Sequence, residues 1–333
     1  MDLLHFKDNA QNRDVISLFS GAMGLDIGLA KAGLNIVIGQ DFDPACVATM
    51  QTNGHKVLGG DIHQINAADL LEQTGMARGE PFLICGGPPC QPFSTAGKRL
   101  GINDPRGSLF MDFIRMIDYI RPRFFIMENV KGIMSAPLKH IPLAGRDKND
   151  PEQRLGTVLD VILSEFNKLG YKTVYGILDA VNYGVPQFRE RFVLIGSRDN
   201  EDIFLPFPTH FQMHQDPSYR WQTLKDTIKD LEHDSGECAA FSKERLAFLR
   251  LVPEGGNWRD LPLEIKKEAM GGAYESGGGK VGFYRRLSYS QPSPTLVTSP
   301  VQKAKENNHT AKAINLTNPK SDVVILQPPS ILA

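Results

Sequence analysis

The chain has 333 residues, of which 41% are hydrophobic and 23% charged, with a formal net charge of −1 at pH 7. This composition excludes collagen-like, disordered and small disulfide-stapled proteins, and it gives no global sign of a polyanionic partner. No stretch approaches the roughly 18 apolar residues of a membrane-spanning helix, and no secretion signal is apparent. The four cysteines form no Cys-x-x-Cys pair, so we expect no zinc site and a reduced, cytoplasmic location.

Strands and helices alternate through the first half of the chain. Short apolar runs predict strands, and repeats at helical spacing predict helices between them. The predicted strands are 14–19, 35–39, 81–85, 123–127 and 192–196, and the predicted helices are 24–32, 109–117, 157–169 and one that begins at 44. Such alternation indicates an α/β fold with a mostly parallel sheet covered on both faces.

The amino-acid composition of the chain changes near residue 197. Residues 197–279 are rich in proline and glycine and carry 10 basic and 15 acidic side chains, whereas residues 280–333 carry 7 basic and 2 acidic ones. We therefore expect three parts: a sheet domain at 1–196, a loop-rich module at 197–279, and a return segment with its tail at 280–333.

Candidate ligand-binding residues follow the predicted strands 14–19 and 35–39 and a further short predicted strand that ends before Gly60. Gly21 and Gly24 lie in a turn between a strand and a helix, where a ligand can approach the backbone. Asp41 can accept two ribose hydroxyls, Phe42 can stack on a purine, and Asp61 can accept from an adenine amino group. This pattern indicates a nucleoside cofactor, although the turn is not the G-x-G-x-x-G of NAD enzymes.

A Gly/Pro-rich segment, Gly-Gly-Pro-Pro-Cys-Gln-Pro-Phe-Ser, follows the predicted strand 81–85 directly. Its prolines restrict the backbone and would hold Cys90 in a defined place above the same sheet edge. We interpret Cys90 as a nucleophile, and Cys46, Cys85 and Cys238 as small buried residues.

Charged residues follow the next predicted strand and precede the last one. Glu128 comes directly after strand 123–127 and could hold a proton near a nucleophile. Arg189 and Arg191 alternate along extended chain, so both could point to one face. Without the cysteine segment, these residues could equally be a solvent-exposed glutamate and a solvent-exposed pair of arginines with no role in a site.

Four segments of the chain, in their order along it, resemble motifs of the bacterial cytosine-C5 DNA methyltransferases. They are Phe-Ser-Gly-x-x-Gly, Gly-Pro-Pro-Cys-Gln-Pro-Phe-Ser, Glu-Asn-Val and Gln-x-Arg-x-Arg. The resemblance extends from about residue 14 to about residue 303 and includes Arg-Arg-Leu-Ser at 285–288. It implies a Rossmann-like methyltransferase domain that uses S-adenosylmethionine, and a smaller, loop-rich target-recognition domain.

The resemblance also implies a mechanism and its residues. Cys90 would attack C6 of a cytosine flipped out of duplex DNA, and Glu128 would contact N3 of the base. Arg191, together with Arg189, would bind O2. No metal is implied. The cofactor pocket would contain Phe19, Gly21, Gly24, Asp41, Phe42, Asp61, Ile62, Pro88 and Leu109.

Residues 93–107 would form a loop that closes over the flipped base. The DNA contacts implied by the resemblance are Ser94, Lys98, Arg99, Arg106 and Arg285. The expected substrate is a short specific sequence in double-stranded DNA, at the nucleoid and beside a cognate restriction endonuclease. The target sequence and the oligomeric state stay open.

The tail departs from this family, whose closing helix bears Gly-Asn-x-Val. No such motif follows Lys303, so we expect that a second polypeptide supplies the helix, that the chain is truncated, or that the cofactor binds weakly. Met23 stands where the family often has glycine. Two alternatives remain: a tRNA cytosine-C5 methyltransferase, and a non-catalytic, partner-dependent DNA-binding subunit.

Overall fold

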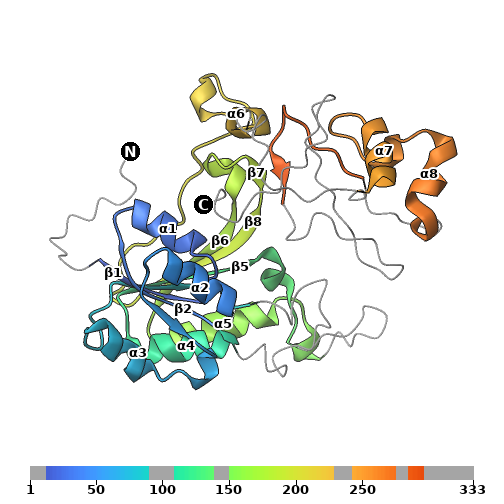
Figure 1. Cartoon of the computed structure of the whole chain (residues 1–333). Coiled ribbons are helices and arrows are strands. Elements are labelled where there is room, and N and C mark those ends of the chain that lie inside the picture. The colour runs from blue at the N-terminus through green and yellow to red at the C-terminus, as the bar shows by residue number, and fades with distance from the viewer. Residues whose placement is uncertain (1–12, 90–108, 139–149, 229–241, 275–283, 296–333) are drawn as a thin grey trace. The chain divides into compact units, whose positions relative to one another are not determined.

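The computed structural model describes residues 13–89, 109–138, 150–228, 242–274 and 284–295 (Figure 1). Within these ranges the chain forms two compact units. The first unit contains residues 13–178 and 190–207, and the second contains residues 179–189 and those that follow 207. The predicted division into catalytic, recognition and return parts concerns function and stays a prediction.

A seven-stranded sheet, in the order β3-β2-β1-β4-β5-β8-β6, is the centre of the first unit. Neighbouring strands run parallel from β3 through β5, and β8 pairs antiparallel with β5. The strands are β1 Asp14–Leu18, β2 Asn35–Asp41, β3 Val57–Gly59, β4 Leu83–Gly86, β5 Phe124–Val130, β6 Lys172–Asp179 and β8 Glu190–Ser197. The predicted α/β class with a mostly parallel sheet is therefore confirmed.

Helices cover both faces of this sheet. Figure 1 shows α1 and α2 on one side, and α3, α4 and α5 on the other. Their bounds are α1 Gly24–Lys31, α2 Pro44–Thr52, α3 Ala67–Thr74, α4 Leu109–Ile120 and α5 Thr157–Lys168. Local chemistry sets their ends: the Asp43 carboxylate accepts the amides of Ala45 and Cys46 at the start of α2, and Gly75 adopts a left-handed conformation after α3.

The period-two alternation of the strands divides the hydrophobic core between the two faces. Ile16 and Ile84 pack in the larger cluster with residues of α3, α4 and α5, whereas Val15 and Leu83 pack in a smaller cluster with Leu29 of α1. Aromatic rings fill the larger cluster. Strands that bury apolar side chains on both faces are typical of a parallel sheet between two helical layers.

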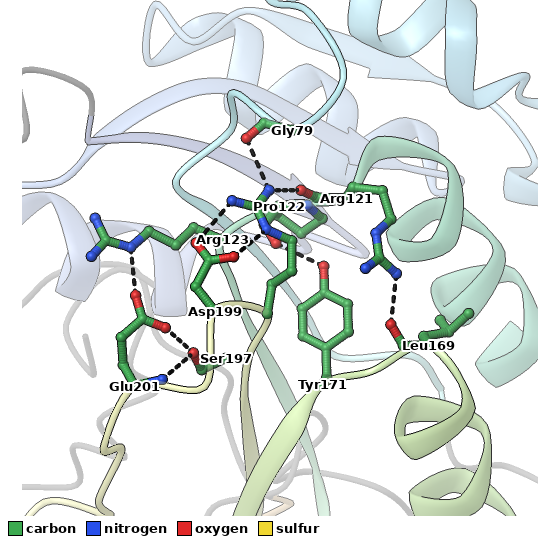
Figure 2. A network of polar contacts seen from close by, with 10 residues as sticks. Gly79, Arg121, Pro122, Arg123, Leu169, Tyr171, Ser197, Asp199 and Glu201 are labelled. Carbon is green, nitrogen blue, oxygen red and sulfur yellow. Dashed lines mark hydrogen bonds and ion pairs between the residues drawn. The ribbon is translucent and has the colours of Figure 1, made fainter.

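A polar network fastens the amino ends of β4 and β5 (Figure 2). The Arg198 guanidinium donates to the carbonyls of Gly79, at 3.0 Å, and Arg121, at 2.6 Å. The Tyr171 hydroxyl donates to the Pro122 carbonyl at 2.7 Å. These bonds pair three backbone carbonyls, and they hold the end of the sheet opposite to the carboxyl ends of the parallel strands.

The second unit contains short elements. β7 Gln187–Phe188 pairs parallel with β9 Ser293–Pro294, and the helices are α6 Leu224–Ile228, α7 Lys243–Leu251 and α8 Leu263–Met270. Leu224, Ile228 and Leu287 form a small buried cluster in this unit. Across the described part of the chain, no helix has the length and apolar character needed to cross a membrane.

Gly196 lies on β8 directly opposite Phe125 of β5. A Cβ added at Gly196 would overlap the Phe125 ring, which is fully buried and stacks on Phe166 at 4.0 Å between ring centroids. We therefore expect Gly196→Ala to destabilise the protein by about 1–3 kcal/mol, because overpacking forces the ring out of its place. Thermal unfolding should show a melting temperature lower by at least about 2 °C.

Gly28→Ala is the matched control. Gly28 lies inside α1, and an added Cβ there would meet no atom within 4 Å. Alanine has the higher helix propensity, so this variant should unfold at the wild-type temperature or slightly above it. Equal melting temperatures for the two variants would contradict the packing described around Phe125.

Candidate active site

The strand order places a topological switch point between β1 and β4. The chain proceeds outward from β1 to β2 and β3, then returns to β4 on the other side of β1. At such a point the loops after the two central strands leave toward opposite faces, which opens a crevice at the carboxyl edge of the sheet. The loop that follows β1 and the segment 87–89 that follows β4 begin at this edge of the sheet.

The loop after β1 adopts an unusual backbone conformation. Phe19, Gly21 and Met23 all have positive φ angles, at 55°, 57° and 63°. The Gly21 amide donates to Asp41 Oδ2 at 2.7 Å, which fixes the loop to the end of β2. A Cβ added at Gly21 or Gly24 would meet nothing within 4 Å, so open space lies beside both glycines.

The predicted acidic residues follow β2 and β3, although both have local structural partners. The Asp41 carboxylate accepts the amides of Gly21 and Asp43, and the Asp61 carboxylate accepts the His63 amide at 3.0 Å, capping a 3₁₀ helix at Ile62–Gln64. Each carboxylate oxygen has a second lone pair, so a ligand hydroxyl or amine can still bind there.

Apolar residues of the predicted cofactor set lie in contrasting environments. Phe42 is 72% exposed, which leaves its ring free to stack on a planar ligand. Ile62 is buried, and Phe19 and Leu109 are partly buried against the larger core cluster. Phe19 and Ile62 thus pack against the hydrophobic core and also lie just after the ends of β1 and β3.

Glu128 and Arg191 form an ion pair, with 2.6 Å between Arg191 Nε and Glu128 Oε1. The antiparallel register of β5 and β8 places Glu128 opposite Val193, and Val130 opposite Arg191. We predicted that Glu128 follows the end of its strand, but the pairing with β8 extends β5 to Val130. The side chains of Arg191 and Glu128 are 23% and 35% exposed, so solvent or a ligand can reach both.

The segment after β4 lies against this pair. A Cβ at Gly87 would approach Glu128 Oε2 to 3.2 Å, and the buried Asn129 amide donates to the Pro88 carbonyl at 2.9 Å. Sequence reasoning assigned no role to Asn129, although it stands inside the Glu-Asn-Val motif. The structure shows that it fastens the beginning of the Pro-Pro-Cys segment to β5.

Two of the four cysteines lie in the described residues, and neither is an activated thiol. Burial raises the pKa of the Cys85 thiol, as does the nearby Asp26. Partial burial, with Asp41 and Asp43 close by, also raises the pKa of Cys46. Cys85 is fully buried as predicted, but Cys46 is only half-buried because it occupies the first turn of α2, at the surface.

The remaining predicted residues separate into three groups. Arg189 belongs to the second unit, is exposed, and donates its backbone amide to Asp179 Oδ1 at 2.8 Å. Arg285 is half-buried in the same unit. Outside the described residues lie Cys90, Ser94, Lys98, Arg99, Arg106 and Cys238.

Two curated proteins are similar to most of the chain. The Type II methyltransferase M.PspPI of Psychrobacter sp. (strain TA137) is 35% identical over 318 residues, which cover 92% of this chain and 69% of that protein. The Type II methyltransferase M.Sau96I of Staphylococcus aureus is 38% identical over 305 residues, which cover 90% of this chain and 64% of that protein. The chain thus spans about two thirds of the length of these relatives.

Two solved structures are similar in fold. One is described as a DNA modification methyltransferase encoded within an E. coli prophage; it has a TM-score of 0.55 and 21% identity, and the match covers 85% of this chain and 82% of that one. The other, a Spodoptera frugiperda DNMT2 mutant, has a TM-score of 0.50 and 20% identity, with 82% of each chain covered. At these identities the likeness concerns the fold.

The family model described as C-5 cytosine-specific DNA methylase matches residues 13–320, nearly the whole chain. This match agrees with the curated relatives and with the geometry at the carboxyl edge of the sheet. The chain belongs to the family of C-5 cytosine-specific DNA methylases.

Proposed function

We propose that the chain methylates cytosine through a covalent adduct between Cys90 and C6 of the base. Membership in the family makes it a DNA cytosine-C5 methyltransferase, and we assign S-adenosylmethionine as its methyl donor. The observation that supports the mechanism is the Glu128–Arg191 pair, which lies against the segment leading to Cys90. The thiols of Cys46 and Cys85 have raised pKa values, which argues against either as the nucleophile.

The chemistry requires a nucleophile because C5 of cytosine is too weak a nucleophile to attack a methyl donor directly. Addition of the Cys90 thiolate to C6 forms an S–C6 bond and turns the ring into an enamine, so that C5 can attack an electrophilic methyl group. Loss of the C5 proton to a base then restores the C5–C6 double bond and expels the thiolate. The methyl donor would leave as its neutral thioether when its sulfur–methyl bond breaks, the proton on N3 would return to Glu128, and the Cys90 thiolate would be regenerated.

Glu128 and Arg191 would act on the polar edge of the base. The Glu128 carboxyl would bind N3 and the exocyclic amine and deliver the proton that favours addition at C6. The Arg191 guanidinium would bind O2 and balance charge on the adduct, with Arg189 as a second candidate. Asn129 holds the Pro88 carbonyl, and so would position the segment that carries the nucleophile.

The open space beside the glycines fits a nucleoside cofactor at the carboxyl edge. A Cβ added at Gly21 in the loop after β1, at Gly24 at the start of α1, or at Gly60 after β3 would meet no atom within 4 Å, so a ligand can approach the backbone there. When bound, S-adenosylmethionine supplies the methyl group as an activated sulfonium. We assign its pocket to Phe19, Gly21, Gly24, Asp41, Phe42, Asp61, Ile62, Pro88 and Leu109.

We further propose double-stranded DNA at the bacterial nucleoid as the substrate, with the cytosine flipped out of the helix. The family match and the Type II relatives favour DNA over tRNA and support a place beside a cognate restriction endonuclease. Target recognition is assigned to 197–279, and DNA contacts are assigned to Ser94, Lys98, Arg99, Arg106 and Arg285.

Cys90→Ser tests the nucleophile. We expect methyl transfer to fall by more than about a thousandfold, because a serine hydroxyl is hardly ionised at neutral pH, while affinity for DNA stays within about threefold. Incorporation of labelled methyl groups and a DNA-binding titration measure the two quantities. Cys46→Ser is the control and should keep activity; undiminished transfer by Cys90→Ser would refute the mechanism.

Glu128→Gln tests the ion pair. We expect the turnover number to fall by about 10²–10⁴-fold, since the amide cannot deliver a proton to N3, with little change in melting temperature. Glu190→Gln is a matched control, because Glu190 forms an ion pair of similar length, 2.7 Å, with Lys131, and that pair is more exposed. Equal activity of the two variants in steady-state kinetics would show that Glu128 has no special role.

A further inference from the structure

Gln40 is a buried residue at the carboxyl end of β2 whose polar groups all bind two neighbouring loops. It is only 1% exposed. Its main chain exchanges hydrogen bonds with Ser20, whose amide donates to the Gln40 carbonyl at 2.9 Å and whose Oγ accepts the Gln40 amide at 3.2 Å. Its side chain donates from Nε2 to the Gly60 carbonyl at 2.7 Å and accepts the Phe19 amide at 3.5 Å.

Both loops have backbone conformations that need outside support. Phe19 has a φ of 55°, the left-handed region that a bulky residue adopts only at a cost of roughly 1–3 kcal/mol. Gly60 has a φ of 129°, which favours glycine. Gln40 contacts the main chain of both residues, so one side chain joins the loop after β1 to the loop after β3.

The loop after β3 has a second, independent attachment. The Arg115 guanidinium of α4 donates to the Ile62 carbonyl at 2.7 Å, just beyond Asp61. The Gly60 amide also donates to the Asp41 carbonyl at 3.1 Å, so both loops would stay attached to the end of β2 without the Gln40 side chain. What its loss would remove is the direct side-chain link between the Phe19 amide and the Gly60 carbonyl, which holds the two loops to each other.

We propose that Gln40 is a positioning residue for S-adenosylmethionine: it sets the distance between Phe19 and Asp61, on either side of the cofactor. This inference rests on the proposed function, which assigns those two residues to the pocket. Gln40 itself need not touch the cofactor, because its amide is already committed to Phe19 and Gly60. Its effect on binding comes through the two loops.

The test uses the full chain with Gln40→Met, which keeps the length of the side chain without its polar groups, and Gln40→Glu, which loses the donor to Gly60. Calorimetry gives the Kd for S-adenosylmethionine, and steady-state methylation of duplex DNA gives kcat and both KM values. We expect the Kd and the KM for the cofactor to rise about tenfold. The kcat at saturating cofactor and the KM for DNA should stay within about threefold.

Tyr171→Phe is the matched control, because it removes one hydrogen bond from a buried side chain to a carbonyl at the opposite end of the sheet. It should leave the cofactor Kd unchanged. Wild-type affinity in either folded Gln40 variant, or loss of the fold in both, would overturn the inference. A wild-type chain that neither binds the cofactor nor methylates DNA would instead refute the proposed function.

Discussion

The antiparallel pairing of β8 with β5 is the constraint on which the site depends. Its register sets Glu128 and Arg191 close enough for a 2.6 Å ion pair, although the two residues lie far apart in the chain. A one-residue slip would turn one of these side chains to the other face of the sheet. Phe125 opposite Gly196 opposes such a slip, because a side chain other than glycine does not fit under the ring.

At the carboxyl edge of the sheet, residues that we assign to cofactor binding also stabilise the backbone of the loops. The Asp41 carboxylate, which we assign to the cofactor, accepts two backbone amides and so also shapes the loop after β1. Gln40 and Asn129 extend this arrangement, since each ties a strand end to a loop through a buried amide. These bonds restrict the backbone at this edge, and a restricted backbone lowers the entropic cost of binding a ligand.

Much of this structure follows from local sequence patterns, because apolar periodicity and capping residues act over short distances. The strands near 14–19, 35–39 and 81–85 and the helix that begins at Pro44 appear as predicted. The end of β5 does not, since it depends on β8, a partner distant in sequence. The position of Gln40 between two loops could not be predicted either, because the sequence does not show which loops a side chain will contact.

The most direct test of the covalent mechanism uses duplex DNA in which the target cytosine carries fluorine at C5. Fluorine cannot leave as a cation, so after methyl transfer the thiolate cannot be expelled and the adduct persists. Mass spectrometry of the digested complex should find the nucleotide on the peptide that contains Cys90. A chain that methylates normal DNA but forms no adduct, or forms it at another residue, would contradict the mechanism.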